Sequence, residues 1–335
     1  MINKGLNKKV EFFLIVILFF FCGSFLSCQH ASEKPRKNVP LIGFLDFIQD
    51  PTIELAKKGF FDALKEQGYS ESDSTITVVY ANAQGDIPTL NQSCDLIISK
   101  DPDLIGTNVT LSTITAAKRT GIIPIFMMVA PRPDIAGLTD SSGNAPPNLY
   151  GVYETLDYID SAITIIHELV PSAKRIGTIF NQSEPQSRDA FFVLSKKCVQ
   201  LGLELESLPV NNSSEAQLVT QALLNKKIDA FFALPDNVIF ASFETVVKSC
   251  NDAKVPVFTS EAGLVSRGAV ASFGADFYQW GFQSGKQAAK YLASGKKDRP
   301  APEIVSVRRK IYNPEVAARF GIKPDSSYSA YTPGR

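Results

Sequence analysis

The sequence predicts an α/β protein with two doubly wound parallel-sheet lobes joined by a hinge. From residue 39 onward, short runs rich in β-branched or aromatic residues alternate with amphipathic stretches, an alternation typical of βαβ units on parallel sheets. The rhythm breaks at residues 130–148, which are rich in proline and glycine, and then restarts. We therefore expect a lobe boundary there. Two series of βα units favour two lobes of similar architecture over one oversized sheet.

The first βα unit is specified by clear local signals. Residues 41–47 form a predicted strand, Asp50 is a suitable N-cap and Pro51 suits the first helical position. Gly68 is a typical residue to end the helix. Apolar residues recur along it at the spacing of one helical face, which predicts a helix lying on a sheet: Ile53, Ala56, Phe60, Phe61 and Leu64.

The same signals predict the remaining elements in order. Before the interruption, the expected strands are 75–81, 104–107 and 123–129, and the expected helices are 88–100 and 111–120. After it, we expect helices at 156–170, 187–201, 214–225 and 238–253, and strands at 175–180, 203–210, 230–234, 255–259 and 269–273. A helix over 276–293 with small residues on its buried stripe, among them Gly281 and Gly285, and a strand over 304–310 complete the prediction.

The N-terminus predicts export and a lipid anchor. Basic residues precede an apolar run over 12–22 that is too short to span a membrane comfortably, the pattern of a signal peptide. Ser27 and Cys28 form a lipoprotein cleavage point, although Phe25 stands where leucine is common. We expect residues 1–27 to be removed, Cys28 to carry acyl chains such as palmitate, and polar residues 28–38 to act as a tether. Plain secretion or an uncleaved anchor are the alternatives.

Charge and cysteine content exclude several classes of function. The chain has 34 basic and 34 acidic residues, so no basic excess favours a nucleic acid as partner. Cys94, Cys198 and Cys250 are predicted to be buried, inert thiols. None of them lies at ligand spacing from a second cysteine or a histidine, so we expect no metal site and no cofactor.

Six sequence strings, in order over much of the chain, resemble the ABC-transporter substrate-binding family that includes tryptophan- and tyrosine-binding lipoproteins. They are KKGFFDALKEQGY (57–69), YANAQGD (80–86), NQSEPQS (181–187), LPDNVI (234–239), VPVFTSEAGLVSRGAVASFG (255–274) and GFQSGKQAAKYLASGK (281–296). The resemblance implies a type I periplasmic binding protein fold, in which the chain crosses between the lobes three times and the ligand occupies the cleft.

This resemblance leads to a division of the chain into lobes. We predict an N-terminal lobe of residues 39–150 and 274–300, a C-terminal lobe of residues 151–273 and 301–322, and a loose tail over 323–335. Two loops depart from the family pattern, at residues 107–112 and 130–134. Both would face the ligand, so the identity of the solute stays open.

Polar side chains at predicted strand ends are the candidate ligand residues. Ligands of open parallel sheets bind beyond the carboxyl ends of the strands, where helix N-termini present free N–H groups. Hydroxyls and helix N–H groups suit a carboxylate, and an acidic side chain suits an ammonium. The candidates are Asp46, Phe47, Gln49, Thr107, Asn108, Val109, Thr110, Arg132, Asn181, Ser183, Glu184, Ser187, Asp236, Asn237 and Glu261.

Each of these residues has a structural alternative. Serine, threonine, aspartate and asparagine before a helix commonly cap that helix, and Arg132 can pair with Asp134. Tyr150 and Tyr153 can stack on a ligand or fill the hinge. The concentration of these candidates at one sheet edge supports ligand binding by the group more strongly than any single residue does.

An enzymatic function is not expected. The two histidines are His30, in the tether, and His167, inside a predicted helix, so a nucleophile paired with histidine has little support. We predict an extracytoplasmic lipoprotein of a bacterial membrane that binds an apolar or aromatic amino acid and passes it to the permease subunits of an ABC importer. A lipid-anchored sensor or receptor for a sugar or nucleoside is the alternative.

Overall fold

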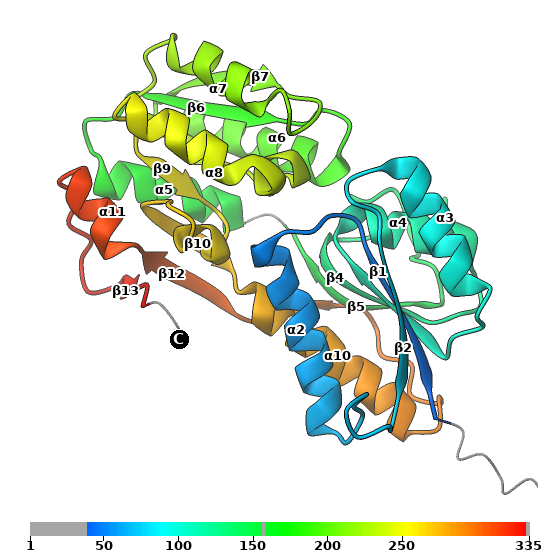
Figure 1. The fold of residues 1–335 in the computed structure, drawn as a ribbon. Coiled ribbons are helices and arrows are strands. Elements are labelled where there is room, and N and C mark those ends of the chain that lie inside the picture. The colour runs from blue at the N-terminus through cyan, green and yellow to red at the C-terminus, as the bar shows by residue number, and fades with distance from the viewer. Residues whose placement is uncertain (1–38, 156–157, 333–335) are drawn as a thin grey trace, which may run out of the picture. The chain divides into compact units, whose positions relative to one another are not determined.

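Two parallel sheets organise the chain. The computed structural model describes residues 39–155 and 158–332 (Figure 1). In this part of the chain one sheet has six strands, in the order β11-β5-β4-β3-β1-β2, and the other has seven, in the order β13-β12-β10-β9-β8-β6-β7. The predicted fold class, α/β with two parallel-sheet lobes, is confirmed. Cys28 and the rest of residues 1–38 lie outside the described residues.

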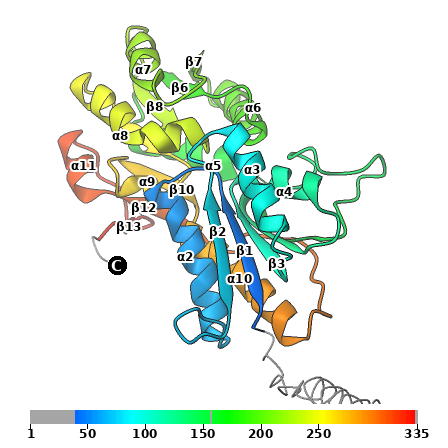
Figure 2. The ribbon, with the colours of Figure 1, turned by 45° about the vertical axis from the view of Figure 1, so that its right-hand side comes forward.

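The first sheet is wholly parallel and carries a pair of helices on each face. Its strands are β1 (Leu41–Asp46), β2 (Thr77–Asn82), β3 (Leu104–Asn108), β4 (Ile125–Pro131), β5 (Leu149–Glu154) and β11 (Glu303–Ile304). Helices α2 (Pro51–Glu66) and α10 (Phe277–Ala293) pack side by side on one face, and α3 (Ile87–Ile98) and α4 (Thr110–Arg119) on the other (Figures 1 and 2).

The second sheet is parallel except where β12 joins it. Its strands are β6 (Arg175–Phe180), β7 (Glu204–Pro209), β8 (Ala230–Ala233), β9 (Val257–Thr259), β10 (Ala271–Ala275), β12 (Arg308–Tyr312) and β13 (Ser329–Ala330), with β12 antiparallel to β10. Helices α7 (Ala216–Leu224) and α8 (Asn237–Asp252) pack together on one face, and α5 (Tyr158–Leu169) packs against α6 (Pro185–Gln200) on the other (Figure 1). The short helices α9 (Ala262–Val265) and α11 (Pro314–Arg319) complete this lobe.

Glycine permits the close approach of α2 and α10. A Cβ atom at Gly281 or Gly285 would overlap the backbone carbonyl oxygens of Ala56 and Phe60, and one at Gly59 would overlap the backbone of Tyr278. The small residues of the α10 stripe are therefore packing residues, as the sequence predicts. This contact matters for function because it fixes α10, which carries the first lobe's aromatic side chains toward the second lobe.

The chain passes between the two lobes at three places. It leaves the first sheet after β5, returns between β10 and α10, and crosses again between β11 and β12. Ion pairs join these segments: Arg308 donates to both carboxylate oxygens of buried Glu154, at 2.6 and 3.1 Å, and Arg309 Nε lies 2.5 Å from Asp276 Oδ2. Ion pairs thus connect the segments that form the hinge.

The structure differs from the predicted lobe limits. Residues 130–148 do not separate the lobes, because they connect β4 to β5 within the first sheet. The sequence does not predict β5, a short strand that directly follows this proline- and glycine-rich segment and contains Gly151, with φ +96°. The predicted strand 304–310 is also two strands, β11 in the first sheet and β12 in the second. In the tail, β13 pairs with β12, and Tyr328 is buried.

Two further observations concern the cysteines and the apolar character of the helices. Cys94, Cys198 and Cys250 are free and buried, as predicted, and burial raises the pKa of each thiol to about 11 or 12. Among residues 39–155 and 158–332, no helix combines the length and the apolar character needed to cross a membrane.

Candidate ligand site

A small cavity lies between the carboxyl ends of the strands of the two sheets. About 370 Å³ of space free of atoms, part of it open to solvent, lies among its lining residues. Both lobes contribute, through the starts of α4, α6, α8 and α10, the end of β4 and the residues around α9. The lining residues are Val109, Thr110, Val129, Ala130, Pro131, Tyr158, Gln186, Pro235, Asn237, Phe240, Glu261, Phe277 and Trp280.

Aromatic side chains from both lobes form one wall of this cavity. The ring of Phe277, on α10, lies 5.8 Å from the ring of Phe240, on α8, and 5.8 Å from that of Trp280. Trp280 Nε1 donates to the carbonyl oxygen of Val152 at 2.8 Å, which fixes the indole. Aromatic rings prefer such tilted and edge-to-face arrangements. The wall therefore suits a flat apolar group entering between the lobes.

Glu261 is the acidic side chain of the cavity. It is fully buried, and its Oε1 accepts hydrogen bonds from Tyr158 Oη at 2.7 Å and Ser260 Oγ at 3.0 Å. Its Oε2 is buried without a hydrogen-bond partner in the described part of the chain. Burial raises the pKa of the Glu261 carboxyl to about 8, against the two hydrogen bonds that lower it. An acceptor left open in a buried site is costly, so this oxygen is suited to a donor brought by a ligand.

Gln186, at the start of α6, offers a second open acceptor. It is buried, and its Oε1 also lacks a hydrogen-bond partner in the part of the chain described. Its amide nitrogen donates to Glu184, which orients the carbonyl end away from that carboxylate. An ammonium group has three donors and can satisfy several acceptors at once. The open acceptors of Gln186 and Glu261 line the same cavity.

The N-terminus of α4 lacks a side-chain cap. Val109 occupies the N-cap position with φ +68° and ψ 163°, and no side chain accepts a hydrogen bond there. The first N–H groups of a helix have no partner within it and attract anions. Val129, on β4, also has a positive φ of +52°. A positive φ is strained for a β-branched residue and clusters at functional sites, and both valines line the cavity.

Asp236 has a different role from its neighbours. It caps α8 by accepting from Val238 N at 2.8 Å and Ile239 N at 3.1 Å with Oδ1. Its Oδ2 accepts from Asn181 N and Ser187 Oγ, both at 2.6 Å. The carboxylate is fully buried and does not line this cavity. Every acceptor it offers is used inside the second lobe, as a helix cap requires.

Glu184 is held by groups of its own lobe. Its carboxylate accepts from both nitrogens of Asn237, at 3.2 and 2.9 Å, from Asn181 Nδ2 at 3.3 Å and from Gln186 Nε2. Burial and the nearby charge of Asp236 raise its pKa to about 8. Because neighbouring amides occupy both oxygens, Glu184 has less capacity than Glu261 to accept from a ligand.

Three candidates of the first lobe face α2 and α4 and not the cavity. Asp46 lies 3.6 Å from Lys57 Nζ, Asn108 Nδ2 donates to Ile53 O at 3.1 Å, and the Thr107 hydroxyl bonds to that of Thr113 at 2.9 Å. Burial raises the pKa of the Asp46 carboxyl to about 6, although Lys57 opposes this shift. Arg132 pairs with Asp134 at 2.6 Å, the alternative that the sequence left open.

The candidates therefore separate into three groups. Val109, Thr110, Asn237 and Glu261 line the cavity. An adjoining, wider cleft between the lobes is lined by Phe47, Gln49, Asn181, Ser183, Glu184 and again Asn237. Neither space is lined by Asp46, Thr107, Asn108, Ser187 or Asp236.

Sequence reasoning missed most of the apolar lining. Phe240, Phe277 and Trp280 lie on helices at positions that periodicity assigns to the core. Tyr158 opens α5, and Gln186 lies within the first turn of α6. Periodicity cannot separate an aromatic residue that packs on its own lobe from one that meets the other lobe. For Phe277 one signal existed: it directly follows Asp276, the cap of α10, at a crossing between the lobes.

The chain belongs to the ABC transporter substrate-binding protein family. The model of that family, described as ABC transporter substrate binding protein, matches residues 41–332. Proteins of this family bind a substrate and are not enzymes, so the predicted family and the predicted absence of enzymatic activity are both confirmed. A tyrosine-binding protein from Clostridioides difficile (strain R20291) is 34% identical over 264 residues, which are 79% of this chain and 75% of that protein.

Two solved structures are also similar to this chain. The ABC domain from Streptococcus pneumoniae in complex with L-Trp is 26% identical, with a TM-score of 0.78 over 86% of this chain and 96% of that one. The ligand-free, open structure of a substrate-binding protein with adhesive properties from Clostridium difficile is also 26% identical, with a TM-score of 0.64 over 88% and 100%. At equal identity, this structure is more similar to the complex than to the open form.

Proposed function

We propose that this chain is the extracytoplasmic, lipid-anchored component of an ABC importer and that it binds an aromatic amino acid in the cavity between its lobes. The observation that carries the proposal is the open, buried Oε2 of Glu261 beside a wall of aromatic rings. The relative named as tyrosine-binding and the L-Trp complex support the same class of ligand.

In the proposed complex, the ligand ammonium lies between Glu261 Oε2 and Gln186 Oε1. Both acceptors are buried and open, and a charge-assisted hydrogen bond to a carboxylate is about twice as strong as a neutral one. Tyr158 and Ser260 hold the other oxygen of Glu261 in place. The site thus has a positioned carboxyl group that ionises as it binds the cationic group of an amino acid.

The ligand carboxylate takes the place of the missing cap of α4. Thr110 begins this helix and lines the cavity, and the side chain at the capping position, that of Val109, makes no capping hydrogen bond. A negative group at a helix N-terminus accepts from free N–H groups and is stabilised by the helix dipole. A sugar has no such group, so this feature favours an amino acid over the alternative of a sugar or nucleoside.

A thermal-shift screen followed by calorimetry tests this proposal. L-tyrosine, L-tryptophan and L-phenylalanine should raise the melting temperature, because a ligand at 100 times its Kd adds about 2.7 kcal/mol to stability. L-leucine should have a smaller effect, and ribose and nucleosides none. The Glu261→Gln variant should bind the best ligand roughly 10- to 100-fold more weakly, since a hydrogen bond to a charged group contributes about 1.5–3 kcal/mol.

Two results would overturn the assignment of the ligand. A response to ribose or a nucleoside with all amino acids silent would favour the sensor or receptor alternative. An unchanged affinity in Glu261→Gln would mean that the ammonium binds elsewhere, and Glu184→Gln would then be the next variant to measure. Circular dichroism of each variant checks that a lost response does not reflect unfolding.

The lipid anchor is tested separately, through Cys28. Cys28→Ser should move the protein from the membrane fraction to the soluble fraction, because several acyl chains anchor far more firmly than none. Amino-acid binding by the released protein should be unchanged, since the ligand site lies within residues 109–280. A Cys28→Ser protein that stays in the membrane fraction would contradict lipidation at this residue.

A further inference from the structure

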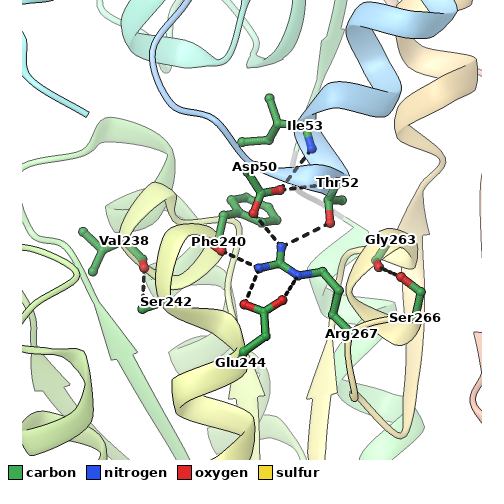
Figure 3. A network of polar contacts seen from close by, with 10 residues as sticks. All are labelled: Asp50, Thr52, Ile53, Val238, Phe240, Ser242, Glu244, Gly263, Ser266 and Arg267. Atoms are coloured by element: carbon green, nitrogen blue, oxygen red, sulfur yellow. Dashed lines mark hydrogen bonds and ion pairs between the residues drawn. The ribbon is translucent and has the colours of Figure 1, made fainter. Parts of the chain in front are cut away.

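Arg267 connects the two lobes outside the cavity (Figure 3). It lies between α9 and β10 in the second lobe, and its Nη1 donates to Asp50 Oδ2, at the start of α2 in the first lobe, at 2.5 Å. The same nitrogen lies 3.4 Å from Thr52 Oγ1. Only 10% of the Arg267 side chain and 1% of the Asp50 side chain are exposed. A shielded pair of this kind is screened less by salt than a surface pair.

Each partner is also fixed within its own lobe. Arg267 Nε and Nη2 donate to the two carboxylate oxygens of Glu244 at 2.7 and 2.9 Å, and Nη2 donates to the carbonyl oxygen of Phe240 at 2.8 Å. Asp50 uses its other oxygen to cap α2, accepting from Thr52 N at 2.8 Å and Ile53 N at 3.1 Å. When the lobes separate, both charges therefore keep partners, and only the contact between the lobes is lost.

A glycine makes this approach sterically possible. A Cβ atom at Gly263, on α9, would overlap Cγ2 of Thr52, on the first turn of α2. Gly263 is not among the glycines with a positive φ, so alanine is compatible with its backbone. The first lobe's Thr52 is the obstacle, and the obstacle exists only while the lobes are together.

We propose that Asp50, Thr52, Gly263 and Arg267 form a latch that stabilises the closed arrangement of the lobes and so sets ligand affinity without touching the ligand. None of the four lines the cavity. Arg267 is thus a positioning residue that acts through closure. Phe240 links the two sites, because its carbonyl oxygen accepts from Arg267 while its residue lines the cavity.

The latch changes affinity through the population of closed molecules. A ligand held by both lobes binds the closed form, and its apparent Kd is the intrinsic Kd divided by the closed fraction. Weakening the latch lowers this fraction in the ligand-free protein and speeds ligand release. The effect on affinity rests on the proposed amino-acid function, whereas the lobe distance of the ligand-free protein can be measured without any ligand.

The first test replaces Asp50 with asparagine. Asparagine caps a helix about as well as aspartate but removes the charge that faces Arg267. Asp86→Asn is the control for the loss of a capping charge, because Asp86 caps α3 by accepting from Thr89 N at 2.8 Å and from Thr89 Oγ1, both within the first lobe. Dyes at the exposed residues Leu96, on α3, and Leu218, on α7, report the distance between the lobes by energy transfer.

Asp50→Asn should shift the ligand-free protein toward longer lobe distances and raise the dissociation rate of L-tyrosine or L-tryptophan roughly 10-fold, while Asp86→Asn should change neither. The ligand-free Asp50→Asn protein should remain folded, because Arg267 keeps its hydrogen bonds to Glu244 and Phe240, and circular dichroism checks this. A lobe-distance distribution in Asp50→Asn equal to that of the wild type would overturn the proposal. If no amino acid binds, the proposed function fails while the distance measurement still decides on the latch.

Gly263→Ala provides a second, independent test of the same latch. It should open the ligand-free protein as Asp50→Asn does, because its methyl group meets Thr52. Adding Thr52→Ser removes the Cγ2 atom and keeps the hydroxyl, so the double variant should recover part of the closed population. Gly263→Ala with an unchanged distance distribution, or a double variant no more closed than the single one, would contradict the proposed contact.

Discussion

The helices α8 and α4 both begin beside the cavity, but they begin in opposite ways. Asp236 caps α8 by accepting two hydrogen bonds with Oδ1, and its Oδ2 accepts from Asn181 N and Ser187 Oγ. Val109 precedes α4 with a positive φ and no side-chain cap. The comparison shows that the hydrogen-bonding capacity of a capping residue such as Asp236 is already used within its own lobe. The position that lacks one is where a charged ligand can be accommodated.

The largest effect is expected from replacing Asp236, the cap of α8. Asp236→Ala should destabilise the protein by about 3–5 kcal/mol, because it removes a buried charge and leaves its donors without partners. Urea unfolding of the ligand-free protein measures this loss. If Asp236→Ala instead keeps wild-type stability and loses only ligand binding, Asp236 is a ligand contact and the comparison is wrong.

The second-largest effect is expected at Val109, which precedes α4 and makes no side-chain cap. Val109→Asp places a negative charge where we expect the ligand carboxylate, and should weaken amino-acid binding roughly 100-fold, since like charges in a buried site repel strongly. Val109→Asn is the matched control, because asparagine has nearly the same shape without the charge and tolerates a positive φ. Calorimetry should show a much smaller loss for Val109→Asn. Equal losses in the two variants would point to shape and not to charge.

The fold could be predicted from sequence because its signals are local and periodic. The cap at Asp50, the proline at 51 and the apolar stripe of the first helix appear in the structure where the sequence places them. The sequence does not predict β5, because this short strand directly follows the proline- and glycine-rich residues 130–148 and contains Gly151. The predicted boundary between residues 150 and 151 therefore falls inside this strand.

The site was predictable only in part, for a physical reason. The rule that ligands bind at the carboxyl ends of strands led to Glu261 and Thr110, which line the cavity. It also led to Asp46 and Asp236, whose side chains are buried within their own lobes. Main-chain position does not determine which way a side chain points. The aromatic wall, contributed by both lobes, requires the tertiary structure.

A graded effect is expected from pH. Burial raises the pKa of Glu261 from 4.5 to about 8. If the ammonium binds the ionised carboxylate, affinity should rise as pH increases from 5.5 to 7.5, by at most about 10-fold per unit. Calorimetric titrations in buffers of different ionisation enthalpy should show release of a proton on binding. In Glu261→Gln this dependence should be lost, and a flat profile in the wild type would argue against an ionised Glu261 in the complex.

Stability of the ligand-free protein should change with pH in the opposite sense. Glu184 and Glu261 both have folded-state pKa values near 8, above the usual 4.5. Between these values the folded state binds more protons than the unfolded state, so the free energy of unfolding should fall as pH rises from about 4.5 to about 8. Melting curves at pH 5.5 and 7.5 measure this, and Glu261→Gln should have a shallower dependence.

The most direct test of the account removes one charged group of the ligand at a time. Calorimetry would compare L-tryptophan with tryptamine, which lacks the carboxylate, and with indole-3-propionic acid, which lacks the ammonium; L-tyrosine, tyramine and 3-(4-hydroxyphenyl)propionic acid form the second series. We expect each deletion to weaken binding roughly 100-fold, because it leaves either the start of α4 or the Glu261 carboxylate without its partner. Binding of either analogue as tightly as the amino acid would contradict the proposed site.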